Sequence, residues 1–152
     1  MPGYGVEQAG DLLPWSWAVE RLIRSHDYWV ATTWPDGRPH VMPVWAVWHR
    51  DSLWFSSGRT SRKARNLAAN PAVSITTDNA SEPVVVDGVV EIVTDRDAIA
   101  EFAEASDAKY EVAYGVEFYA SPDNVCCRVV PTSIFALDSE RFTESPTRWT
   151  CI

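Results

Sequence analysis

The chain has 152 residues, 46% of them hydrophobic and 22% charged, with a formal net charge of −8 at pH 7. This length predicts a single domain over residues 1–152, and the aromatic content excludes a disordered chain. The negative charge disfavours nucleic acids and anionic membranes as partners, because both are polyanions. No apolar run approaches the ~20 residues that cross a bilayer, so we expect a cytoplasmic protein.

The first part of the chain predicts one helix followed by three strands. From Pro14 to Ser25, apolar residues recur close to helical spacing. The next segments are rich in β-branched and aromatic residues, and the turn Pro35–Arg38 joins the first two of them. The strands are expected over residues 28–34, 40–49 and 52–57. Short connections make these three strands a meander.

The rest of the chain predicts two further helices and further strands. The helices are expected over residues 60–70 and 94–110. Strand composition marks residues 72–77, 83–93 and 125–138. Asp87-Gly88 is either a hairpin turn or a bulge, and Pro131 indicates a sheet edge or a bend. Six or seven short strands, three helices and no regular βαβ alternation predict a mainly β (α+β) fold, a small antiparallel barrel.

The cysteines and histidines indicate neither a disulfide scaffold nor a metal site. The cysteines number three, and the neighbours Cys126 and Cys127 would point to opposite faces of a strand. The histidines share no metal-ligand spacing with one another or with the cysteines. We therefore expect no metal. His40 could line a pocket, although a surface or edge-strand position is the simpler interpretation.

Basic residues gather in one segment of this acidic chain, residues 59–65, and no Asp or Glu occurs from residue 52 to residue 77. Arg62, Lys63 and Arg65 would lie in the first turn of a helix capped by Thr60 or Ser61, where the helix dipole disfavours cations. A bound phosphate would reverse that preference, because helix-end amides, hydroxyls and cations all favour an anion. The alternative is a solvated basic face.

The stretch LWFSSGRTSRKARNLAANPAVSI resembles the pyridoxamine 5′-phosphate oxidase-like split β-barrel superfamily, and the resemblance extends over residues 28–77. It implies a six- or seven-stranded split β-barrel of the FMN-binding-protein type. In that superfamily a serine–arginine–lysine turn holds a flavin phosphate, which implies as phosphate ligands Ser61, Arg62 and Lys63. Ser56 and Ser57, at the end of the preceding strand, and Arg59, in the same turn, are implied cofactor contacts.

The sequence departs from authentic pyridoxamine phosphate oxidases at substrate and cofactor positions. Those enzymes carry an arginine and a lysine where this chain has Val41 and Ala46, and they end with an arginine–x–histidine pair, whereas this chain ends SPTRWTCI. Vitamin B6 oxidation is therefore not expected. The segments GRPHVMPVW and PTRW instead resemble the flavin/deazaflavin oxidoreductases of the same superfamily, many of which bind coenzyme F420.

The deazaflavin resemblance implies further cofactor contacts. The residues that would run beside the ring system are Pro43, Val44 and Trp45. Trp45 and Trp149 are candidates for contact with a planar cofactor or substrate, although packing in a core or a dimer is the commonest use of tryptophan. Arg148 would pair with the acidic tail of the cofactor or with a surface carboxylate such as Glu144.

The resemblance implies an oxidoreductase that uses F420 to transfer a hydride to or from a small conjugated molecule. The redox chemistry belongs to the cofactor, so no catalytic residue is named, and His40 and Tyr28 are the candidates if a proton donor is required. One alternative is an FMN-dependent oxidoreductase with the same phosphate site. Another is a non-catalytic protein that binds a flavin, F420 or a haem-type ligand.

The resemblance also implies a homodimer with the cofactor sites at the interface. A surface rich in tryptophan is consistent with such an interface. Binding of nucleic acid through the basic segment is disfavoured by the net charge of −8. The expected partners are therefore a small-molecule substrate and a second copy of the chain.

Overall fold

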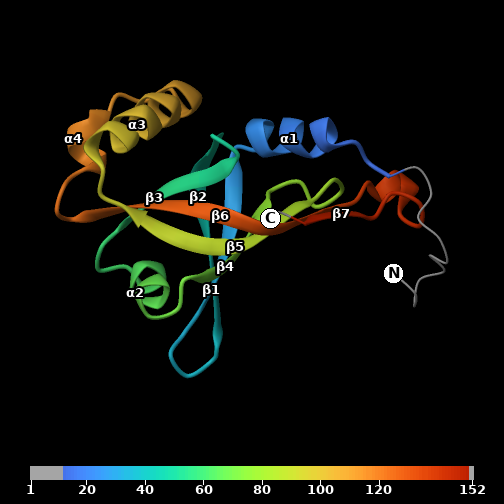
Figure 1. Ribbon diagram of the computed structural model, residues 1–152, viewed down its shortest axis with the longest axis horizontal. Coiled ribbons are helices and arrows are strands. Elements are labelled where there is room, and N and C mark those ends of the chain that lie inside the picture. Colours follow the sequence, from blue (N-terminus) through green and yellow to red (C-terminus); the bar gives the residue numbers. More distant parts are fainter. Residues whose placement is uncertain (1–11, 151–152) are drawn as a thin grey trace.

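The structure is a computed structural model that describes residues 12–150 (Figure 1). Its strands are β1 (Asp27–Thr33), β2 (Pro39–His49), β3 (Ser52–Gly58), β4 (Ala72–Thr77), β5 (Val84–Val93), β6 (Asn124–Ala136) and β7 (Thr147–Thr150). Its helices are α1 (Trp15–Arg24), α2 (Arg62–Ala69), α3 (Arg96–Tyr110), α4 (Gly115–Tyr119) and the 3₁₀ helix η1 (Ser139–Arg141).

The strands form one antiparallel sheet in the order β3-β2-β1-β4-β5-β6-β7. An additional pairing of β3 with β6 closes the first six strands into a barrel, and β7 continues the sheet beyond β6. Helices α3 and α4 lie together at one end of the molecule, whereas β7 extends toward the other end (Figure 1). The predicted α+β split-barrel fold is confirmed.

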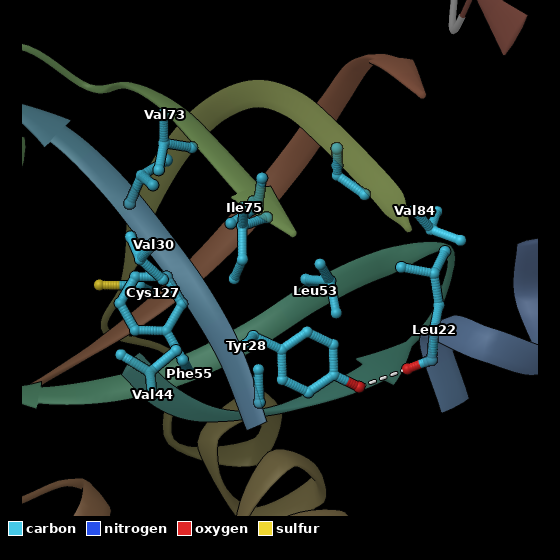
Figure 2. Close-up of a cluster of buried hydrophobic side chains, with 14 of the residues drawn as sticks. Leu22, Tyr28, Val30, Val44, Leu53, Phe55, Val73, Ile75, Val84 and Cys127 are labelled. Atoms are coloured by element: carbon cyan, nitrogen blue, oxygen red, sulfur yellow. Dashed lines mark hydrogen bonds between the residues drawn. The ribbon is translucent and has the colours of Figure 1, made fainter. Parts of the chain in front are cut away.

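The interior of the barrel is filled by side chains. Along β1, residues alternate, so that Tyr28 and Val30 are buried while Trp29 is 46% exposed. The Tyr28 ring lies among the apolar side chains, and its hydroxyl donates a hydrogen bond to the carbonyl of Leu22 (Figure 2). Burying each such aliphatic or aromatic side chain stabilises the fold by about 1.5–3 kcal/mol. A filled interior places any ligand site on the outside of the barrel.

Helix α2 is capped by Ser61 and is held against the barrel by Asn66 and by the contact of Ser61 with Ser57 of β3. Ser61, rather than Thr60, is its N-cap, and the Ser61 side chain accepts a hydrogen bond of 3.2 Å from the amide of Ala64. Asn66 is fully buried, and its Nδ2 donates to Oγ1 of Thr32 on β1 at 3.1 Å. The amino end of α2 is therefore fixed beside the end of β3.

Strand β5 passes through Asp87-Gly88 without turning. The register against β6 shifts between these two residues, so that Asp87 faces Ser133 and Gly88 faces Pro131. The dipeptide is therefore a bulge and not a hairpin turn. Pro131 lies opposite this irregularity, and on the other side of β6 it falls between the β3 pairing, which reaches Val129, and the β7 pairing, which begins at Ser133. This position fits both the bend and the sheet edge that the sequence allowed.

Three elements lie outside the sequence prediction: α4, the 3₁₀ helix η1 and β7. Three helices are expected, whereas residues 12–150 hold four α-helices and one 3₁₀ helix. The additional α-helix, α4, follows a turn in which Glu111 and Gly115 have φ of 55° and 68°. The carboxyl-terminal PTRW segment contributes to β7, which pairs with β6. In the described part of the chain, no helix is long and apolar enough to cross a membrane.

Candidate functional site

A cavity of about 390 Å³ lies on the outside of the barrel, where β2 and β3 continue beyond their last pair, Ala46 with Phe55. Helix α2 and the α3–α4 pair lie on either side of these strand ends (Figure 1). The floor is formed by Pro43, Val44, Trp45, Ser56, Ser57 and Gly58. This volume falls within the range of about 300–1,000 Å³ typical of small-molecule sites.

The α2 side of the cavity, here called the polar end, is formed by Ser57, Ser61 and Lys63. The hydroxyls of Ser57 and Ser61 are 2.8 Å apart. Lys63 is half-buried, and burial lowers the pKa of its ammonium group. Within residues 12–150, Lys63 forms no ion pair. A half-buried cation beside two hydroxyls and a helix amino end suits a phosphate.

Two arginines of the basic segment point elsewhere. The Arg62 guanidinium carbon lies 3.7 Å from the ring centroid of Trp34, whose ring also has Arg38 at 4.6 Å. Arg59 donates to the carbonyls of Pro122 at 2.6 Å and Asn124 at 2.8 Å, and it lines a separate cavity. Neither Arg62 nor Arg59 lines the 390 Å³ cavity. Of the three implied phosphate ligands, Ser61 and Lys63 lie together and Arg62 lies apart.

The two carboxyl-terminal candidates lie on β7, outside the cavity. Arg148 donates to the hydroxyl of Ser133 at 3.1 Å, which is neither the cofactor tail nor the carboxylate considered from the sequence. Trp149 packs against the barrel core and meets the ring of Trp15 edge-on at 5.4 Å. Within one chain, β7 and α2 lie far apart (Figure 1). These two residues could reach a cofactor only on another copy of the chain.

Neither candidate proton donor lines the cavity. Tyr28 is buried in the barrel, accepts a hydrogen bond of 2.8 Å from Nζ of Lys109, and has its pKa raised by burial. His40 lies near the β1–β2 hairpin, with Nδ1 3.5 Å from Oγ1 of Thr32. A tyrosine whose hydroxyl is buried and whose pKa is raised does not release a proton to a ligand outside the barrel.

Trp45 presents one face to the cavity and rests on a ring from α3. Its ring stacks on that of Tyr110 with centroids 4.4 Å apart and planes 3° apart, and 43% of Trp45 is exposed. The hydroxyl of Tyr110 accepts a hydrogen bond of 2.8 Å from the amide of Ala46, which ties the supporting ring to β2. The indole is therefore held in one orientation while its surface stays open to a ligand.

Four aromatic residues of α3, α4 and the turn before α4 line the other side of the cavity. This aromatic wall consists of Phe102, Tyr114, Phe118 and Tyr119. The sequence analysis missed it, because a five-residue helix has no measurable periodicity. The signal that could have revealed it is the density of aromatic residues in AYGVEFY.

Comparisons with known proteins agree with this fold. A family model of pyridoxamine 5′-phosphate oxidase matches residues 18–138. A conserved hypothetical protein from Mycobacterium tuberculosis is 23% identical, with a TM-score of 0.77 over 87% of this chain and 89% of that one. A structure named F420 reductase is 31% identical, with a TM-score of 0.62 over 76% of this chain and 93% of that one.

A haem-binding protein from Mycobacterium smegmatis shares the fold at 17% identity, with a TM-score of 0.71 over 91% of this chain and 59% of that one. No curated protein matches the chain in sequence. At 17% and 23% identity, similarity shows the fold alone. Among the cavity-lining residues there is no histidine, cysteine or methionine, and the residues able to ligate haem iron are Tyr114 and Tyr119.

Proposed function

Because the chain belongs to the pyridoxamine 5′-phosphate oxidase family, we propose that it is an oxidoreductase that uses coenzyme F420 to transfer a hydride to or from a small conjugated molecule. The observation that carries the proposal is the half-buried Lys63, which forms no ion pair within residues 12–150, at one end of a cavity that Trp45 also lines. The 31% identity to a protein named F420 reductase favours the deazaflavin over FMN.

The residues of the cavity fit a phosphate-bearing planar cofactor. Lys63 would bind the phosphate together with the hydroxyls of Ser57 and Ser61, and the first-turn amides of α2 would add further donors. Trp45, supported by Tyr110, would orient the ring system. When bound, the deazaflavin supplies two-electron chemistry, in which the acceptor gains a hydride and takes a proton from water. The protein then has to bind, orient and exclude water.

FMN is the alternative cofactor, because the same polar end would bind its phosphate. The positions at which pyridoxamine phosphate oxidases carry a basic pair are here the 51% exposed Val41 and the buried Ala46. Neither side chain can neutralise a phosphate, so the second half of an FMN phosphate site is missing within one chain. This favours F420.

A turnover assay distinguishes a reductase from a carrier. The purified protein is mixed with reduced F420 and a set of conjugated acceptors, and oxidation of F420 is followed by its absorbance. We expect oxidation of F420 with at least one acceptor at a rate that depends on protein concentration. Tight binding of F420 without turnover of any acceptor would instead identify a non-catalytic binding protein.

We propose that two copies of the chain form a homodimer through the outer face of β1 and β2. On this face Trp29, Val41 and Trp45 are 46%, 51% and 43% exposed. Trp45 also lines the cavity together with Ser56 of β3, so a second copy on this face would also cover the cavity. Light scattering should give the mass of two chains at micromolar concentration. A monomer at high micromolar concentration would contradict the dimer.

A further inference from the structure

The aromatic wall divides into two buried and two exposed rings. Phe102 and Tyr119 are 2% and 4% exposed and belong to a hydrophobic cluster under α3 and α4. Tyr114 and Phe118 are 48% and 44% exposed, with ring centroids 4.7 Å apart, and both line the cavity. Packing of the fold explains the first pair. It does not explain why two large rings stay open to water on a five-residue helix and the turn before it.

Helix α4, which carries Phe118 and begins directly after Tyr114, is fixed in place by polar contacts. Asp107 accepts hydrogen bonds from the amide of Gly115 at 2.8 Å and from the hydroxyl of Tyr119 at 3.2 Å. The carbonyl of Phe118 accepts from Nδ2 of Asn124 at 2.8 Å. An ion pair between Arg96 and Glu117 joins α4 to the start of α3. The backbone that carries the two exposed rings is therefore fixed before a ligand binds. Binding would then cost little conformational entropy at this segment.

The charges around the cavity differ between its two sides. Lys63 lies at the polar end, where an anionic group would bind. On the α4 side, no charged side chain of the described residues lines the cavity, and Glu117 is paired with Arg96. The hydroxyl of Tyr114 makes no hydrogen bond with any residue from 12 to 150, so it is available to donate one to a ligand. This side suits a flat, uncharged ring that carries an acceptor oxygen.

We propose that Tyr114 and Phe118 form the substrate subsite, which binds a planar, uncharged conjugated carbonyl compound against the ring face of Phe118, with its oxygen toward the hydroxyl of Tyr114. The subsite rests on the proposed function, since it supplies the acceptor for the hydride. Exposed Trp45, on the floor of the same cavity, would contact the cofactor instead.

The test compares Phe118→Ala with Phe142→Ala. Phe142 is 38% exposed and does not line the cavity, so it is the matched control. The probes are 1,4-naphthoquinone and its anionic 2-sulfonate. With reduced F420 present, Phe118→Ala should raise the KM for the quinone about tenfold, the size expected for loss of a stacked ring. The Kd for F420 should stay within about twofold of the wild-type value, as should both constants in Phe142→Ala.

Calorimetry on the protein without cofactor separates this inference from the proposed function. The wild type should bind naphthoquinone, and Phe118→Ala should bind it about tenfold more weakly. The sulfonate is compared only with F420 bound, because Lys63 at the unfilled polar end would otherwise bind it. The weaker quinone binding would support the subsite even if F420 failed to bind. An unchanged quinone affinity in Phe118→Ala would overturn it. A parallel loss of F420 affinity in Phe118→Ala would also overturn the subsite, because it would show that the cofactor ring itself contacts Phe118.

Discussion

Replacement of Lys63 by glutamate should weaken the binding of F420 by at least about 100-fold, while the protein remains folded. The change removes a charge-assisted hydrogen bond to the phosphate, worth about 1.5–3 kcal/mol, and adds a repulsive carboxylate. A 100-fold loss corresponds to about 2.7 kcal/mol. Stability should not fall, because Lys63 forms no ion pair within residues 12–150 and a carboxylate is favoured in the first turn of a helix. Affinity is measured by quenching of tryptophan fluorescence, and folding by circular dichroism.

Arg65→Glu is the matched control for this prediction. It makes the same change of charge in the first turn of the same helix, but Arg65 is exposed and does not line the cavity. It should weaken binding by no more than about threefold at moderate salt, because the charge is screened. An equal loss in both variants would show that only the overall charge of α2 matters. Unchanged affinity in Lys63→Glu would show that the basic segment is a solvated face and not a phosphate site.

For Arg62, the family resemblance and the structure lead to different expectations. The resemblance implies a phosphate ligand, whereas in the structure Arg62 lies over Trp34 and does not line the cavity. If the resemblance holds for all three ligands, Arg62→Glu should match Lys63→Glu. The contact of Arg62 with Trp34 instead favours an intermediate effect, because the guanidinium would have to leave the ring to reach the cavity. The comparison of the two variants decides which of these positions binds phosphate directly.

Gly88→Ala should destabilise the fold by about 1–3 kcal/mol or more, the range of overpacking in a filled interior. A Cβ at Gly88 would lie 2.4 Å from the carbonyl oxygen of Val130 and 3.0 Å from a methyl carbon of Val129. Both atoms belong to β6, and the nearer one is backbone, which cannot move aside by rotation. The bulge would have to open. The free energy of unfolding is measured by urea titration.

Gly58→Ala serves as the control for this substitution. No atom lies within 4 Å of a Cβ built on Gly58, and its φ is outside the left-handed region. The free energy of unfolding should therefore change by less than about 0.5 kcal/mol. If Gly88→Ala were as stable as the wild type, β5 and β6 would not have the close approach described at the bulge.

The strands and helices that the sequence predicted correctly are those with strong local signals. Residues 72–77 read as a strand from composition alone, and β4 has these bounds. Ser61 was one of two possible caps, and only the path of the chain into α2 decides between them. Helix α4 is too short to show a periodic pattern, and β7 depends on pairing with β6. Neither element could therefore be predicted from local sequence.

In the candidate site, too, the positions set by neighbouring segments were predictable from the sequence. The contacts between distant segments were not. Pro43 to Trp45 and Ser56 to Ser57 line one cavity because they directly follow the last β2–β3 pair, Ala46 with Phe55, of two consecutive strands. The side-chain directions of Arg62 and Arg59 depend on Trp34 and on the loop before β6, which are distant in sequence. Spacing along the chain holds no information about such partners. The aromatic wall was missed for a different reason, because α4 is too short for a periodic pattern.

A parallel titration of the protein with F420 and FMN tests the proposed function most directly. Tryptophan fluorescence is the natural signal, because Trp45 lines the cavity and a bound ring system would quench it. Measured at low salt, F420 should bind with micromolar affinity and FMN at least about tenfold more weakly, a difference of about 1.4 kcal/mol. Tighter binding of FMN, or binding of neither cofactor, would contradict an F420-dependent oxidoreductase.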